Sequence, residues 1–334
     1  MVRRNNNPAS YQTMHERAPF SGLDEARRSD TTSAAPHRQE TAMISPWIPL
    51  SLLCAFSLAT SDALAKRALT HHNEHLILWL RLLLASPFLL AMLPFIPIPT
   101  LAPGFYRATL VSLPLEALAS VLYIRALKLS PLSLTLPLLA LTPLFLLAVP
   151  SLLLGERISR AGTAGVLLIV TGTYCLNLGR ARREFLEPLR ATMRDRGARC
   201  MLGVALIYSV TSTLGKQAVA ASSPLFFAAI YIPLLTLLLT PLALRNMKGG
   251  VRGVFASGAV KEAILPALFY ALMVLTHMSA IAMTRVAYMI SLKRLSLLMG
   301  VIYGHVLFHE QGIAGRLAGT LLMLCGVALI TLYP

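Results

Sequence analysis

Long apolar segments dominate the sequence and decide what it can fold into. A helix needs about 20 apolar residues to cross roughly 30 Å of hydrocarbon. The 334-residue chain contains ten such segments, at about 45–66, 74–96, 104–127, 131–154, 160–178, 199–219, 223–244, 261–283, 286–308 and 313–333. Hydrophobic residues make up 56% of the chain and charged residues only 13%, the balance of a membrane protein. The sequence therefore predicts an all-α integral membrane protein with ten transmembrane helices.

Other features of the composition exclude competing classes. Residues 1–44 are polar and have no periodic apolar face, which predicts a disordered tail. The four cysteines have neither CxxC nor CxxH spacing, so neither a disulfide framework nor a zinc site is expected. The net charge of +16 comes mainly from the tail and the loops, where lipid headgroups explain it better than nucleic acid. We expect no cofactor.

Two parts of the chain repeat one another. At an offset of 154, residues 155–172 align with residues 309–326, and both contain Glu-x8-Gly-x6-Gly. This register pairs Glu156 with Glu310, Gly165 with Gly319, and Gly172 with Gly326, while a second register at an offset of 150 pairs Lys66 with Lys216. An odd number of spans in each copy inserts the second copy upside down, the arrangement of many secondary transporters.

The predicted architecture is thus two inverted five-helix repeats, at 45–178 and 199–334, joined by a basic linker loop at 179–198. The glycines of each pair lie seven residues apart on one helix face, which favours close packing of the fifth and tenth helices. This packing is expected within the bundle or between subunits, and the second arrangement allows a homodimer.

These halves resemble the drug/metabolite transporter superfamily, and in particular its EamA-like family. Each half closes with a Gly-Glu or His-Glu turn and the glycine-patterned helix, and the stretch WLRLLLASPFLL is similar to the family's Arg-led second helix. The resemblance covers about residues 45–333. It implies a transporter but leaves the substrate open, because the superfamily moves amino acids, purines, sugars, drugs and phosphorylated sugars.

Charges inside the predicted spans are candidates for function, because each costs about 2.5–3.5 kcal/mol at a helix centre. They are Asp62, Lys66, Arg81, Glu116, Lys216, Lys293 and Arg294. Lys66 and Lys216 lie near helix ends, so their stems can reach the interface. We expect Arg81 and Glu116 to pair with each other, and Asp62 to pair with Lys66 four residues later.

Lys293 and Arg294 are adjacent and point about 100° apart on a helix, so at least one should face a polar cavity. The seven charges comprise five bases and two acids, and an anionic or carboxylate-bearing substrate would relieve the surplus of three. The pair also resembles the basic pair of the sugar-phosphate translocators, whose further cation is missing from the fourth segment here. A carboxylate is therefore at least as good a candidate as phosphate, and a structural or gating role for the pair stays open.

Three further patterns bear on the site. Tyr123 and His277 coincide in the repeat, so substrate contact at the midplane competes with a core hydrogen-bonding role. Prolines recur through the fourth segment and predict a bend or break; they are Pro131, Pro137, Pro143 and Pro150. His305, His309 and Glu310 lack the H-E-x-x-H order, so no metal site is expected.

The orientation in the membrane is contested. The basic linker belongs in the cytoplasm by the positive-inside rule, which places both termini outside. The family resemblance places both termini inside.

These observations predict a secondary transporter that moves a small metabolite, such as an amino acid or organic acid, by alternating access in the bacterial cytoplasmic membrane. Asp62 or Glu116 would carry a coupling proton if either acid lacks a permanent partner. The alternative is a membrane-embedded enzyme acting on a lipid phosphate, which requires an acidic or nucleophilic cluster at the water interface. A passive channel or scaffold would not need paired polar positions in the two halves.

Overall fold

The computed structural model describes residues 45–129, 138–139, 141–177, 195–247, 254, 257–308 and 317–333. Outside the described residues lie the predicted tail at 1–44 and most of the predicted linker at 179–198, together with Pro131, Pro137, His309 and Glu310.

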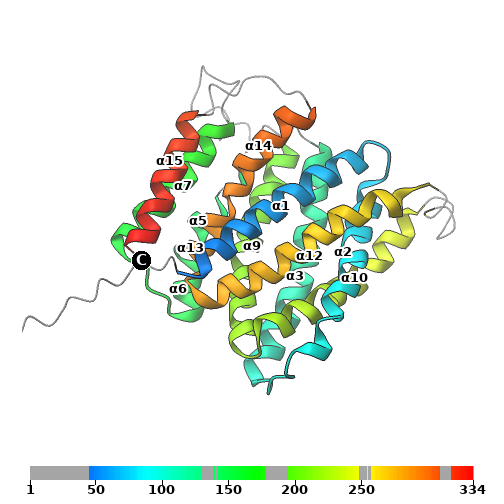
Figure 1. Ribbon diagram of the computed structural model, residues 1–334, viewed down its shortest axis with the longest axis horizontal. Coiled ribbons are helices and arrows are strands. Elements are labelled where there is room, and N and C mark those ends of the chain that lie inside the picture. The colour runs from blue at the N-terminus through cyan, green and yellow to red at the C-terminus, as the bar shows by residue number, and fades with distance from the viewer. Residues whose placement is uncertain are drawn as a thin grey trace, which may run out of the picture. The chain divides into compact units, whose positions relative to one another are not determined.

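The described secondary structure is helical throughout, as predicted (Figure 1). The first part contains α1 (Trp47–Leu69), α2 (Glu74–Leu90), η1 (Leu93–Phe95), α3 (Pro103–Leu129), α5 (Thr142–Phe145), α6 (Val149–Leu154) and α7 (Arg160–Asn177). The second contains α9 (Arg196–Ala220), α10 (Pro224–Asn246), α12 (Ala259–Met283), α13 (Val286–Lys293), α14 (Leu295–Phe308) and α15 (Leu317–Leu332). Because α9 begins at Arg196, the end of the predicted linker is helical.

Six described helices are long and apolar enough to cross a membrane. They span Trp47–Leu69, Glu74–Phe95, Pro103–Tyr123, Arg196–Ala220, Pro224–Asn246 and Ala259–Met283. The predicted count of ten crossings in two inverted repeats stays a prediction, as do the domain boundaries.

Local sequence signals explain where several helices begin. The Asn73 side chain accepts the His75 N–H at 2.9 Å and caps α2, and Asp195 accepts the Ala198 N–H at 2.7 Å and caps α9. Ser223 caps α10 in the same way. Each cap satisfies a backbone donor that the first helical turn leaves without an intrahelical partner.

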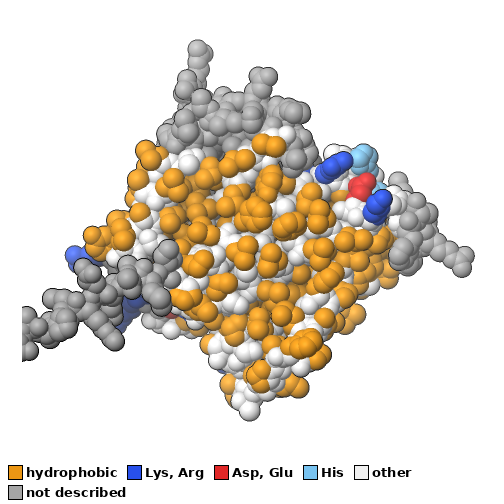
Figure 2. Space-filling model, in the orientation of Figure 1, with side chains coloured by type: hydrophobic (Ala, Val, Ile, Leu, Met, Phe, Trp, Pro, Cys, Tyr) orange, Lys and Arg blue, Asp and Glu red, His pale blue; other side chains and the backbone are white. Residues whose placement is uncertain are grey.

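The described surface is rich in apolar side chains. Leu110, Leu237 and Leu321 are 69%, 70% and 65% exposed, and Figure 2 shows hydrophobic side chains across most of the described face. Such a surface is costly in water and is stable against lipid acyl chains.

Helix packing can be compared with the predicted repeat. The α1 helix packs against α12, and α3 packs against α9. In the repeat, α1 corresponds to α9 and α3 corresponds to α12, so the two contacts are equivalent. The remaining large contacts include two that join repeat-related helices directly, α2 to α10 and α7 to α15 (Figure 1).

The repeat glycines lie in the α7–α15 contact. Gly165 is next to Gly326, and Gly172 is next to Gly319. The close packing that these glycines allow occurs within one chain. The glycines therefore provide no separate argument for the expected homodimer.

The fourth and ninth predicted segments are both interrupted. In the fourth, Pro143 and Pro150 lie in the first turns of α5 and α6, the positions where a missing backbone N–H costs least. The ninth, predicted as one helix over 286–308, is instead divided into α13 and α14 at Arg294.

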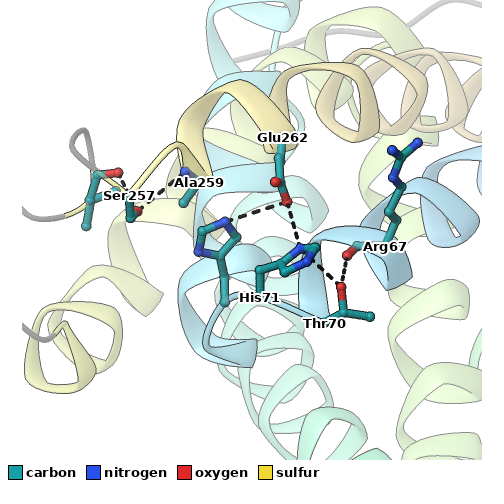
Figure 3. Close-up of polar contacts among 8 residues, drawn as sticks. Arg67, Thr70, His71, Ser257, Ala259 and Glu262 are labelled. Carbon is teal, nitrogen blue, oxygen red and sulfur yellow. Dashed lines mark hydrogen bonds and ion pairs between the residues drawn. The ribbon is translucent and has the colours of Figure 1, made fainter.

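A polar contact joins the turn after α1 to the start of α12 (Figure 3). The rings of His71 and His72 lie 3.9 and 3.5 Å from the Glu262 carboxylate. Thr70 donates to the carbonyl oxygen of Arg67 at 2.7 Å and closes the last turn of α1. The described residues include no group of three or more His, Cys, Asp or Glu placed to hold a metal ion.

Candidate functional site

The interruption at Arg294 places the basic pair at the centre of the candidate site. The Arg294 N–H donates to the carbonyl oxygens of Ile290 and Ser291, at 3.2 and 3.1 Å, and the Leu297 N–H donates to the Arg294 carbonyl oxygen at 2.9 Å. The last two bonds span three residues, so the helix tightens into a 3₁₀ turn here. Such turns within helices often mark hinges.

Lys293 points toward α12 and α1. Its Nζ lies 3.5 Å from Nδ1 of His277 in α12. Its charge also interacts with Cys54 and Asp62 of α1 and with Glu116 of α3. The structure therefore brings Lys293 and His277 together, although they come from different predicted spans.

Arg294 is buried and its hydrogen-bonding capacity is incompletely used. The residue is 7% exposed, and its Nε has no hydrogen-bond partner among the described residues. Its charge interacts with the hydroxyl groups of Tyr123 and Tyr208. Ser291, three residues earlier on the same helix side, is fully buried and its hydroxyl also lacks a partner in the described region. Unsatisfied buried polar groups are uncommon in proteins, so these two groups are available to bind a water molecule or a ligand.

Arg81 pairs with Asp62, which corrects two of the predicted ion pairs. Its Nη1 donates to Asp62 Oδ1 at 2.8 Å, and its guanidinium lies over the Tyr270 ring, 4.6 Å from the centroid. The sequence predicts instead that Arg81 pairs with Glu116, and Asp62 with Lys66. The helix contacts bring the Asp62 side of α1 to α2, and sequence spacing carries no information on that contact.

Glu116 lies on α3 among polar groups from other helices. Its carboxyl group lies near Thr211 of α9 and interacts electrostatically with Lys293. An acid and a base from separate helices therefore share this region, with Tyr231 of α10 nearby.

We call these residues the central polar cluster: Asp62, Arg81, Glu116, Tyr123, Tyr208, Tyr270, His277, Lys293 and Arg294. Its charges comprise three bases (Arg81, Lys293 and Arg294) and two acids (Asp62 and Glu116), a formal surplus of one positive charge. The Asp62 side chain is 48% exposed, so the cluster extends to the protein surface.

Lys216 takes a separate position and forms an ion pair with Glu156. Lys216 also donates to the Thr284 carbonyl oxygen at 2.6 Å, and Glu156 accepts the Val286 N–H at 3.2 Å. The two side chains are 21% and 12% exposed, and both partners of Lys216 lie in turns between predicted spans, so its position at the membrane interface stays a prediction. We call this group of four residues the Glu156 junction.

Lys66, the repeat equivalent of Lys216, lies in the last turn of α1 and is half-buried. Its equivalent acid, Glu310, is outside the described residues.

Sequence reasoning does not identify several residues and contacts in and around these groups. Thr211 and Cys54 give no signal, because a threonine and a cysteine are ordinary in membrane helices. The contact of Arg81 with Tyr270 is also missed, since the two residues lie far apart in the chain. Glu156 is predicted to serve in a turn and in packing, with no partner.

Buried charges between apolar helices able to cross a bilayer define an integral membrane protein with a polar interior. Residues 45–178 match the model of the EamA-like transporter family, part of the drug/metabolite transporter superfamily. The family resemblance expected from the sequence is thus confirmed over these residues, and it indicates a membrane transporter of small molecules, consistent with a non-enzymatic protein.

Comparison with other proteins adds information on the fold. No curated protein matches the sequence. A solved structure described as "Crystal structure of protein" matches with a TM-score of 0.68 and 18% sequence identity, covering 87% of this chain and 100% of that chain. At that identity the likeness concerns the fold alone.

Proposed function

We propose that the protein is a secondary transporter that moves a small anionic or carboxylate-bearing metabolite by alternating access, with Lys293 and Arg294 holding the anion. The observation that carries the proposal is the buried Arg294 at an interrupted helix, with an Nε that has no partner among the described residues. An amino acid or an organic acid has the required carboxylate, and the proposed location is the bacterial cytoplasmic membrane.

The charge balance of the central polar cluster supports an anion. The sequence alone indicates a surplus of three positive charges, but Lys216 has its own acid in Glu156. The cluster keeps a surplus of one, which suits a single carboxylate better than a doubly charged phosphate. Tyr123 and His277, one from each half of the repeat, would contact the rest of the substrate.

The position of α13 supports coupling between substrate and conformation. This eight-residue helix is about 12 Å long. Val286 at one end belongs to the Glu156 junction, and Lys293 at the other end belongs to the central polar cluster. A short helix moves as a rigid unit, so a substrate that displaces Lys293 would strain the junction. Release of the junction would then open one side of the protein.

The exchange of helix partners between the halves supports alternating access as well. Equivalent contacts of α1 with α12 and of α3 with α9 give two similar interfaces, and inverted halves can interchange two such arrangements. Glu116, beside Thr211 and Lys293, is the better placed acid for a coupling proton, because Asp62 is occupied by Arg81.

A ligand-binding experiment tests the site. The thermal stability of the purified full chain would be measured with amino acids, organic acids, sugar phosphates and cationic drugs. The variants are Lys293→Gln and Arg294→Lys, and Lys261→Gln, an exposed base on α12, is the control. We expect a carboxylate compound to stabilise the wild type and Lys261→Gln, and to stabilise the two site variants much less.

A transport experiment tests the mechanism. Proteoliposomes loaded with the compound that binds should exchange it for labelled external compound, and the site variants should lose this exchange. Stabilisation by cations alone, or by an anion equally in all variants, would assign a structural role to the basic pair. Exchange that persists in Lys293→Gln and Arg294→Lys would also assign a structural role to the basic pair.

A further inference from the structure

A groove lies between the end of α3 and the start of α9, apart from the central polar cluster. Its volume is about 460 Å³. Arg125 and Leu129 of α3 line one wall, and Arg196, Arg199 and Gly203 of α9 line the other. Three arginines thus line one groove.

The three arginines have no acidic partner among the described residues. All three side chains are exposed, and none belongs to a described ion pair. Asp195, the nearest acid in sequence, caps α9 by accepting the Ala198 N–H at 2.7 Å. The start of α9 adds the positive end of a helix dipole. Three converging cations repel one another, and a bound anion would offset that repulsion.

The groove lies at the ends of two apolar helices. The α3 helix ends at Leu129 and α9 begins at Arg196, so Arg125 lies in the last turns of one helix and Arg196 in the first turn of the other. The ends of membrane-crossing helices lie at the depth of phospholipid phosphates, and arginine binds phosphate oxygens through two parallel N–H donors. Basic pockets at this depth are a recognised form of anionic lipid site.

Apolar side chains continue from the groove toward the membrane interior. Leu122 lines the groove itself, and Leu118, one turn further in, is 49% exposed. On α9, Leu206 lies seven residues beyond Arg199, on the same side of the helix, and is also 49% exposed. Such positions suit an acyl chain attached to a headgroup that the arginines hold.

We propose that this groove binds the phosphate headgroup of an anionic phospholipid, whose acyl chains lie along α3 and α9. The site is separate from the proposed transport site, because none of its residues belongs to the central polar cluster. Bound lipid would fix the end of α3 against the start of α9.

Native mass spectrometry of the purified full chain tests the proposal. The probes are dioleoyl-phosphatidylglycerol and dioleoyl-phosphatidylcholine, which have the same acyl chains and differ in net charge. The soluble probes are glycerol 3-phosphate and inorganic phosphate. One variant combines Arg125→Gln, Arg196→Gln and Arg199→Gln. The control combines Arg67→Gln, Arg107→Gln and Lys261→Gln, three exposed bases elsewhere, so that both lose the same charge.

We expect phosphatidylglycerol to bind at least about tenfold more tightly than phosphatidylcholine, and the groove variant to lose most of that preference while the control keeps it. Gly203→Leu should also weaken binding without changing charge. Its Cβ would lie 4.0 Å from Leu122 Cδ1, so the backbone can accept it while the larger side chain enters the groove.

Equal binding of the two lipids, or an equal loss in the groove and control variants, would overturn the proposal. So would binding of the soluble phosphates with no preference for phosphatidylglycerol, because the groove would then be a site for free anions. The lipid-binding result does not depend on the transport proposal, because Lys293 and Arg294 are unchanged in every groove and control variant. The two proposals can therefore fail separately.

Discussion

Gly165 of α7 and Gly326 of α15 contact each other reciprocally. A Cβ on Gly165 would lie 2.8 Å from the Gly326 carbonyl oxygen, and a Cβ on Gly326 would lie 2.6 Å from the Gly165 carbonyl oxygen. Gly172 stands in the same relation to Gly319, at 2.6 Å. Since the repeat equates Gly165 with Gly319 and Gly172 with Gly326, the two contacts are exchanged by the repeat, as in a two-fold interface.

Substitution of Gly165 by Ala should destabilise the protein. The added methyl group has no room between the two backbones, so we expect a loss of about 1–3 kcal/mol in unfolding free energy. Gly300→Ala in α14 is the control, because a Cβ added there would meet no described atom within 4 Å, and helix propensity favours alanine. Unfolding in mixed micelles measures both. Equal stability of the two variants would contradict the close contact.

The helical character of the described segments could be predicted because long apolar runs have few alternatives in a bilayer. The interruption in the fourth segment was also predictable, since Pro143 and Pro150 lack backbone donors. The interruption at Arg294 was not. No proline or glycine lies at that point, and the 3₁₀ turn depends on the surroundings of a buried guanidinium, which only the fold determines.

The candidate site was predictable in its residue types and not in its pairings. Arg81, Asp62 and Glu116 could be identified as candidates from the sequence because a charged side chain is costly in hydrocarbon. Which acid meets Arg81 depends on the rotation of α1 and α3 about their axes, and a chain with weak amphipathic patterning does not specify that rotation. The partner of Lys216 could not be predicted either, because Glu156 comes from a turn outside the predicted spans.

The pairing of Arg81 with Asp62 can be measured by a double-mutant cycle. Arg81→Gln and Asp62→Asn should show a coupling of about 1 kcal/mol, reduced from the value for a buried pair because Asp62 is half exposed. The matched cycle uses Arg81→Gln with Glu116→Gln, which should be additive within about 0.5 kcal/mol. A larger coupling in the second cycle would restore the Arg81–Glu116 pair expected from the sequence.

Tyr303→Phe should loosen the contact of α14 with α1. The Tyr303 hydroxyl lies 2.7 Å from Thr60 Oγ1, and that threonine also donates to the Phe56 carbonyl oxygen at 2.9 Å. Thr60 therefore keeps one bond, and we expect a loss of about 1 kcal/mol in stability. Tyr106→Phe, an exposed tyrosine on α3, is the control and should leave the melting temperature unchanged. Equal melting temperatures for both variants would mean that the α1–α14 hydrogen bond does not contribute.

The Glu156 junction should affect transport although it does not belong to the central polar cluster. Lys216→Met leaves Glu156 with the Val286 N–H as its described donor, and breaking a largely buried ion pair costs about 3–5 kcal/mol. Because α13 joins the junction to Lys293, we expect the variant to populate the state open on the junction side. Substrate exchange should slow, while binding measured by thermal shift should persist.

Accessibility to a membrane-impermeant thiol reagent can separate this effect from general loss of stability. With the four native cysteines replaced by serine, a single cysteine at Thr284 should react slowly in the otherwise unchanged protein and faster after Lys216→Met. Lys261→Met, which removes an exposed base from α12, should react at the slow rate. Equal reactivity in all three proteins, with exchange unaffected, would mean that the junction is a static contact. Faster reaction that slows when substrate is added would link the two ends of α13, because the substrate would then stabilise a different arrangement of the same helix.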